Sequence, residues 1–129
     1  YISEGGMIRK GAISAHAGEM LLIPFNMRDG AVIARGKGNE DWNCSAPHGT
    51  GRAMSRTKAF QTLDTRSFVN EMRDAGIYCP SACETTLDES PEAYKPADDV
   101  LRLMDPTVDV IHRLKPIWNF KATGKRGRR

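Results

Sequence analysis

A histidine set among glycines and followed by two arginines is the feature of this chain best suited to chemistry. It lies in the segment SAPHGTGRAMSR, residues 45–56. Glycine lets backbone approach a ligand closely, and backbone amides at a helix start attract anions. At helical spacing Arg52 and Arg56 would share one face, and guanidinium groups match phosphate oxygens well. The spacing thus predicts that His48 handles phosphate; the alternative is a loop or helix-start histidine followed by solvated arginines.

The bulk composition indicates one ordinary globular domain. The chain has 129 residues, of which 40% are hydrophobic and 27% charged. These values argue against wholesale disorder, and no apolar run approaches the ~20 residues of a membrane span. No charged and then apolar signal segment follows Tyr1. We therefore expect a cytoplasmic protein without a membrane partner.

The basic character of the chain is concentrated at its C-terminal end. The formal net charge is +3, but four of the 19 Lys and Arg side chains lie in residues 125–129. The other 15 face 16 acidic side chains, so the remainder is close to neutral. Residues 122–129 are expected to form a disordered, solvated tail, and weak nonspecific attraction to nucleic acid is the alternative.

The three cysteines do not suggest a disulfide framework. Cys44, Cys79 and Cys83 are an odd number, as is usual in a reducing compartment. Cys79 and Cys83 have no second Cys or His pair nearby to complete a zinc set, so structural thiols are expected. Cys44 lies four residues before His48 and either lines its pocket or is a small packed residue.

In the first half of the chain, two apolar runs indicate a hairpin. Residues 7–15 read as the start of a strand, and the runs at 20–23 and 31–34 flank the turn signal Asp29-Gly30. A turn is expected at 36–39. A helix is expected to begin around residues 48–51 and to continue to about residue 62.

In the second half, capping and apolar spacing predict three helices. The clearest covers 65–75, capped by Asp64 or Thr65 and stopped by Gly76. Others are expected at 97–104 and after Asp105-Pro106, with an apolar face of Val108, Ile111 and Leu114. Short strands are expected at 77–79 and 117–120, and mostly loop at 84–95. The fold class is therefore mixed α/β (α+β), with antiparallel strands and packed helices in one unit over 1–121.

A family resemblance covers nearly the whole chain. The string SAPHGTGRAMSR, together with IRKGA at residues 8–12 and LIP at 22–24, closely resembles the C-terminal part of the RtcB family of RNA-splicing ligases. The resemblance implies the C-terminal portion of the RtcB-like fold. It also implies an enzyme that uses GTP to join an RNA 3′-phosphate, or 2′,3′-cyclic phosphate, to a 5′-hydroxyl, in tRNA splicing or RNA repair.

The same resemblance assigns His48 as the nucleophile. In the family a histidine attacks the α-phosphate of GTP, which gives a histidine-guanylate and pyrophosphate. The guanylate then moves to the RNA 3′-phosphate, and the 5′-hydroxyl displaces GMP. Neutral imidazole is available for such an attack at cellular pH.

Other residues match family positions around the nucleotide and the RNA. Lys10, Arg52 and Arg56 match residues near phosphate or RNA, where cations neutralise charge during transfer. Tyr94 matches a family tyrosine that packs against the guanine, and Lys121 matches a lysine that contacts the base. The alternative for Tyr94 is a core tyrosine, and the alternative for Lys121 is a surface lysine. The remaining nucleotide-binding positions that the resemblance implies are Asn26, Met27, Arg28, Asp29, Gly49, Thr50 and Gly51.

The nucleotide loop departs from the pattern of some family members. Residues 25–29 read FNMRD where others carry a GSMGT type of loop. A serine hydroxyl near the nucleotide is thereby replaced by Asn26, which still offers hydrogen-bonding groups.

The metal site that the family uses is expected to lie outside this chain. Its manganese ligands are a cysteine, an acidic residue and several histidines, all upstream of the region matched here. His16, His48 and His112 do not substitute for them, and His16 and His112 are expected to be exposed or structural. A cation must orient the triphosphate, so we expect the isolated chain not to guanylylate itself.

Two further classes of function stay open at this point. One is a non-catalytic module that binds nucleotide or RNA through Arg52, Arg56 and the basic tail. The other is one half of a split enzyme that works only with a separate N-terminal chain. Removal of most of a ligase core would expose apolar surface, which favours oligomerisation.

Overall fold

The computed structural model describes residues 6–122, which form two compact units. The sheet unit contains residues 6–25, 31–51 and 96–114, and the helical unit contains 26–30, 52–95 and 115–122. The expected division into a domain at 1–121 and a tail at 122–129 stays a prediction, because residues 123–129 lie outside the described residues.

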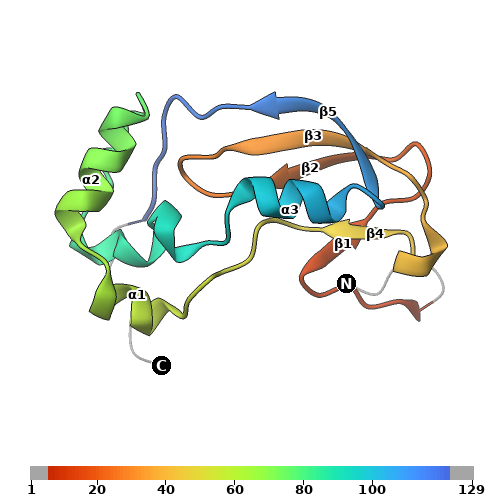
Figure 1. Cartoon of the computed structure of the whole chain (residues 1–129), viewed down its shortest axis with the longest axis horizontal. Coiled ribbons are helices and arrows are strands. Elements are labelled where there is room, and N and C mark those ends of the chain that lie inside the picture. The colour runs from red at the N-terminus through yellow and green to blue at the C-terminus, as the bar shows by residue number, and fades with distance from the viewer. Residues whose placement is uncertain (1–5, 123–129) are drawn as a thin grey trace. The chain divides into compact units, whose positions relative to one another are not determined.

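Antiparallel strands form the framework of the sheet unit (Figure 1). Strands β2 (Met20–Pro24), β3 (Ala31–Gly36) and β5 (Val108–Leu114) form one sheet in the order β2-β3-β5. Strands β1 (Ala12–Ser14) and β4 (Ser45–Pro47) form a separate pair. The predicted hairpin is confirmed, since β2 pairs directly with β3 around the polar loop.

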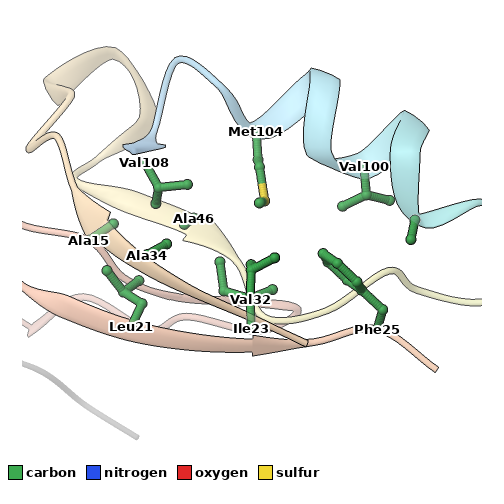
Figure 2. Close-up of a cluster of buried hydrophobic side chains, with 11 residues drawn as sticks. Ala15, Leu21, Ile23, Phe25, Val32, Ala34, Ala46, Val100, Met104 and Val108 are labelled. Carbon is green, nitrogen blue, oxygen red and sulfur yellow. The ribbon is translucent and has the colours of Figure 1, made fainter. Parts of the chain in front are cut away.

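Helix α3 (Ala97–Met104) supplies the other side of the sheet unit's core. Its buried residues Ala97, Val100 and Met104 recur at helical spacing, which gives one apolar face. In Figure 2, Val100 and Met104 point towards the buried side chains of β2 and β3, including Ile23 and Val32. A helix packed on antiparallel strands confirms the mixed α+β class.

The helix expected after Asp105-Pro106 is wrong, because residues 108–114 are strand β5. Asp105 is the C-cap of α3, and the Thr107 amide donates to the Met104 carbonyl at 2.8 Å, so this dipeptide turns the chain. The β-branched residues at 108, 110 and 111 favour a strand, and pairing with β3 satisfies its backbone.

The helical unit contains α1 (Arg56–Thr62), α2 (Thr65–Asp74) and two 3₁₀ helices, η3 (Glu84–Glu89) and η4 (Pro91–Ala93). A third 3₁₀ helix, η2 (Glu40–Trp42), lies in the sheet unit. Helix α2 confirms its prediction: Asp64 accepts from the Ser67 amide at 2.7 Å, and Gly76 follows the helix with φ +71°. The segment 84–95, expected to be mostly loop, holds both η3 and η4.

Helix α1 begins later than the spacing indicates. Residues 45–47 are a strand, and Gly51 has φ +67°, which a right-handed helix cannot contain. Ser55 caps the helix by accepting from the Lys58 amide at 3.1 Å, so Arg56 is its first residue. Arg52 therefore lies outside α1, and the expectation that it shares a helical face with Arg56 is wrong.

The two short strands expected at 77–79 and 117–120 are reduced to one bridge. Tyr78 pairs in parallel with Trp118 through two backbone hydrogen bonds, and the flanking residues are irregular. Among residues 6–122, no helix combines the length and apolar character needed to cross a bilayer.

Candidate functional site

Four of the residues singled out from the sequence converge on one carboxylate in the helical unit. Oε1 of Glu89 accepts from Arg52 Nη2 at 3.0 Å and from Arg56 Nη1 at 2.9 Å. Oε2 accepts from the Tyr94 hydroxyl at 2.9 Å and from Lys121 Nζ at 3.2 Å. We call Glu89 and these four residues the Glu89 cluster.

Asp88 adds a second acidic residue beside the Glu89 cluster. Its side chain is only 6% exposed and forms an ion pair with Arg56. Its backbone carbonyl accepts from Arg52 Nη1 at 2.7 Å. The sequence analysis missed both acidic residues, because η3 carries them more than thirty positions after the arginines.

Arg52 is held on several sides by the helical unit. It forms an isolated antiparallel bridge with Tyr94, and its guanidinium carbon lies 4.8 Å from the centre of the tyrosine ring. Arg52 Nη2 also donates to the Tyr94 hydroxyl at 3.2 Å. Such a stacked guanidinium gains a cation–π contact and loses freedom to reorient. Tyr94 is therefore part of a polar network and is not a plain core tyrosine.

The environment of the cluster alters how its members titrate. Burial opposes ionisation of Glu89, but hydrogen bonds from Tyr94, Lys121 and Arg56 hold its pKa below the ordinary glutamate value. Burial and the neighbouring Glu89 carboxylate raise the pKa of Tyr94. The pKa of Arg56 is raised, because its bonds to Asp88 and Glu89 outweigh burial. The ionic form of the network is therefore the stable one at neutral pH.

Acid is expected to destabilise the protein partly through Glu89. Because its folded pKa lies below the unfolded one, its contribution is complete above the ordinary glutamate pKa and is lost as pH falls through the folded value. The free energy of unfolding, measured by urea denaturation at pH 7 and pH 3, should fall less in Glu89→Gln than in wild type. Glu19 and Asp64 also have lowered pKa values, but wild type and Glu89→Gln both keep them, so their contribution to the acid effect is the same in the two proteins. An equal fall in both proteins would contradict the prediction, and the exposed Glu92→Gln is the matched control.

A cavity of about 840 Å³ opens beside the cluster within the helical unit. Arg56, Lys121 and both acidic residues line it, together with Phe60 and several polar side chains of α1 and η3. Phe60 is 47% exposed, so the wall offers an aromatic surface as well as cations. Aromatic surface beside cations suits a nucleotide, whose base stacks while its phosphate is neutralised.

The loop expected to contact nucleotide is braced from within the helical unit. Asn26 Oδ1 accepts from the amides of Arg28 and Asp29 at 3.0 and 2.8 Å, and Asn26 Nδ2 donates to Asp29. Hydrogen bonding to Asp29, more than the partial burial that opposes it, keeps the pKa of Arg28 raised, and Arg28 also pairs with Glu71. Met27 is buried, and its carbonyl accepts from Asn119 at 2.7 Å. The loop conformation is thus fixed by its own side chains.

His48 is exposed at the end of strand β4, in the sheet unit. Its amide donates to the Gly11 carbonyl at 3.4 Å, next to the register pair Ala12 and Pro47. Lys10, also exposed, immediately precedes Gly11. The structure therefore brings His48 and Lys10 to the same end of the β1–β4 pair.

Gly49 and Thr50 fix the backbone after His48 against strand β2. A Cβ on Gly49 would lie 2.8 Å from the Pro24 carbonyl oxygen, so only glycine fits without a shift. Thr50 is buried, and its hydroxyl donates to the Phe25 carbonyl at 3.3 Å. Gly51 then turns the chain with φ +67° towards Arg52.

Gly49→Ala is expected to destabilise the sheet unit by about 3 kcal/mol, since the added methyl meets a strand carbonyl that cannot move freely. The measurement is the free energy of unfolding from urea denaturation. Gly51→Ala is the control: its Cβ meets open space, so only backbone strain of roughly 1 kcal/mol is expected. Equal costs at the two positions would contradict the close approach.

Residues 6–122 do not contain a donor set for the family's manganese. Within that range no three His, Cys, Asp or Glu side chains gather as metal ligands would. The residues described here therefore do not fit a metal ion.

Cys44, half-buried with φ +45°, lines a cavity of about 260 Å³ with His16 and Arg9 in the sheet unit.

Comparison with known proteins identifies the family. A family model described as tRNA-splicing ligase RtcB matches residues 4–122. The chain belongs to the RtcB family of tRNA-splicing ligases.

The relatives are RNA ligases of much greater length. The RNA-splicing ligase RtcB of Escherichia coli K12 is 40% identical over 114 residues, which cover 88% of this chain and 27% of that protein. The tRNA-splicing ligase RtcB of Aeropyrum pernix is 35% identical over 110 residues, covering 81% of this chain and 23% of that protein. This chain spans about a quarter of the length of these relatives.

Proposed function

We propose that this chain is the guanylate-accepting, phosphate-binding part of a GTP-dependent RNA ligase. Such a ligase joins an RNA 3′-phosphate or 2′,3′-cyclic phosphate to a 5′-hydroxyl, as in tRNA splicing or RNA repair. The observation that carries the proposal is the exposed His48 on a braced turn beside Lys10, four residues before the anchored Arg52.

In this proposal His48 is the nucleophile. A ring nitrogen of neutral imidazole attacks the α-phosphorus of GTP; a P–N bond forms as the P–O bond to pyrophosphate breaks and pyrophosphate leaves with the electron pair. Where the RNA ends in a 2′,3′-cyclic phosphate, water first adds to the phosphorus and the bond to the 2′-oxygen breaks, which leaves a 2′-hydroxyl and a 3′-phosphate. An oxygen of the RNA 3′-phosphate then displaces the imidazole and takes the guanylate. The 5′-hydroxyl of the second RNA end finally attacks the phosphorus of the RNA 3′-phosphate and loses its proton, and GMP leaves.

The cationic residues have distinct roles in the same proposal. Lys10 lies by the turn that carries His48 and offers a positive charge to the phosphates there. Arg56 and Lys121 line the cavity; Arg56 neutralises further phosphate charge, and Lys121, whose family counterpart contacts the base, offers its ammonium group to base and phosphate alike. Arg52 and Tyr94 act through the network around Glu89, and the loop at 26–29 supplies nucleotide contacts.

The metal and the rest of the catalytic machinery are proposed to come from the part of the family's length that this chain does not span. The relatives are more than three times as long, which supports this view. Divalent cations supply charge neutralisation at a triphosphate. The chain by itself is therefore proposed to be inactive, and a separate N-terminal half would restore activity.

The test is labelling of the chain with GTP carrying ³²P at the α-phosphate, in the presence of manganese. The chain alone should form no adduct. The chain mixed with the non-matching remainder of the Escherichia coli relative should form a covalent guanylate and ligate RNA. A mixture whose two chains associate but still form no adduct would contradict the proposal. An adduct on the chain alone would refute its dependence on the missing portion.

A second candidate, a non-catalytic module for nucleotide or RNA, is favoured by the cavity. The residues that line this cavity all belong to the helical unit, and they include cations and the exposed Phe60. Salt-dependent RNA binding that survives His48→Ala, with no adduct in the mixed system, would favour this function. Loss of that binding on removal of residues 125–129 would assign it to the basic tail.

A further inference from the structure

The placement of Glu89 is unexpected for a site that is to bind phosphate. A carboxylate beside arginines competes with an incoming anion and repels it, which lowers affinity unless the carboxylate does something else. Glu89 is also partly buried, with a side chain 15% exposed. The four side chains that donate to it within residues 6–122 all belong to the proposed site.

The donors of the cluster divide into two sets. Arg52 is 22% exposed, and both its terminal nitrogens are already occupied, by the Asp88 carbonyl, Glu89 and the Tyr94 hydroxyl. Neither Arg52 nor Tyr94 is among the residues of 6–122 that line the cavity. These two side chains hold the carboxylate and have little left to offer a ligand.

Arg56 and Lys121 form the second set and face the cavity. Their side chains are 46% and 38% exposed. Arg56 uses only Nη1 in its pairs with Asp88 and Glu89, so its Nε and Nη2 have no acceptor among the described residues. Lys121 Nζ uses one bond, to Glu89, and two further protons point elsewhere.

The geometry places these spare donors close together. Arg56 donates to Oε1 of Glu89 and Lys121 donates to Oε2 of the same carboxylate. The two cations are therefore linked through one carboxylate by two hydrogen bonds. Three cations, Arg52, Arg56 and Lys121, face two carboxylates, which leaves one net positive charge. Without Glu89 the cations would repel one another, and flexible side chains would lose their common direction.

We propose that Glu89 is the positioning residue of an anion site, holding Arg56 and Lys121 so that their remaining donors converge on a phosphate group in the cavity. The inference rests on the proposed function and names the residue that organises its phosphate contacts. Phe60, half-exposed on the same wall, suits the base that accompanies such a phosphate.

The experiment measures binding of a fluorescein-labelled single-stranded RNA ten nucleotides long with a 3′-phosphate, by anisotropy at several salt concentrations. If Glu89 only repelled anions, Glu89→Gln would bind RNA more tightly. If it positions the cations, Glu89→Gln should bind about 10-fold more weakly, and the slope of log K against log[salt] should shrink by about 0.7, one phosphate contact. Arg56→Gln should show a similar loss.

Two comparisons separate positioning from charge and from folding. Glu92→Gln removes an exposed acidic residue of the same unit and should bind RNA as tightly as wild type or more tightly. The double variant Glu89→Gln/Arg56→Gln should lose little beyond either single variant, because both act on one contact. Should Glu89→Gln fail to fold, Glu89→Asp keeps the charge but is too short to reach both cations, and it should also weaken binding.

The outcomes distinguish this inference from the function on which it rests. Wild-type chain that binds RNA, with Glu89→Gln or Glu89→Asp binding equally or more tightly, overturns the positioning role alone. Guanylate formation in the mixed system would then still support the ligase proposal. Wild-type chain without salt-dependent RNA binding overturns the positioning role even if the adduct forms.

Discussion

His48→Ala is expected to abolish the covalent guanylate when the chain is combined with the missing portion of a relative. Without the imidazole nitrogen no P–N bond can form, and loss of a nucleophile costs on the order of 10³-fold or more. The measurement is ³²P retained on the chain after denaturing electrophoresis. His48 is exposed, so its removal should change the free energy of unfolding by less than about 0.5 kcal/mol.

A second exposed histidine provides the matched control. His112 lies on β5 opposite Ile33, and its side chain is also exposed. His112→Ala removes the same group from the same unit and should leave the adduct intact. Adduct that persists in His48→Ala, or that disappears equally in both variants, would remove the nucleophile from the proposal.

Features that depend on neighbouring residues could be predicted from the sequence. The hairpin of β2 and β3 follows from two apolar runs around Asp29-Gly30, and α2 follows from the Asp64 cap and the Gly76 stop. In both cases the residues that decide the structure lie within a few positions of it. Local chemistry was sufficient there, because no distant partner had to be known.

Strand β5 shows where local spacing fails. Val108, Ile111 and Leu114 recur at intervals that suit a helix, yet these residues pair with β3. The pairing has a bulge between Ile33 and Ala34, which a regular pattern of alternation does not reveal. The backbone of this segment is satisfied by a strand more than seventy positions earlier, so only the tertiary structure could decide.

The arginines illustrate the same limit at the candidate site. Their spacing suggested one shared helical face, which is wrong because Gly51 keeps Arg52 out of the helix, although both side chains do bond the same carboxylate. What joins them is Glu89, far along the chain. The only sequence signal was an acidic pair shortly before Tyr94, and acidic pairs are common on solvated faces.

The second large effect is expected from Phe68→Ala in the helical unit. Phe68 is 1% exposed and packs in one cluster with Met27, Met72, Ile77 and Leu87. Replacing such a ring leaves a cavity and costs about 3–5 kcal/mol. Because Met27 belongs to the loop proposed to contact nucleotide and Leu87 directly precedes Asp88, the loss should also weaken RNA binding. Urea denaturation followed by Trp118 fluorescence, in a Trp42→Phe background that removes the second tryptophan, measures the stability of this unit.

The neighbouring residue of α2 tests whether burial is the cause. Val69 directly follows Phe68 in the helix but is 40% exposed. Val69→Ala should therefore cost less than about 1 kcal/mol and leave RNA binding unchanged. Similar losses from the two substitutions would mean that the helix, and not the cluster beneath it, supports the loop and the acidic pair. Loss of stability and RNA binding in Phe68→Ala alone would show that the Glu89 cluster depends on the core beneath it.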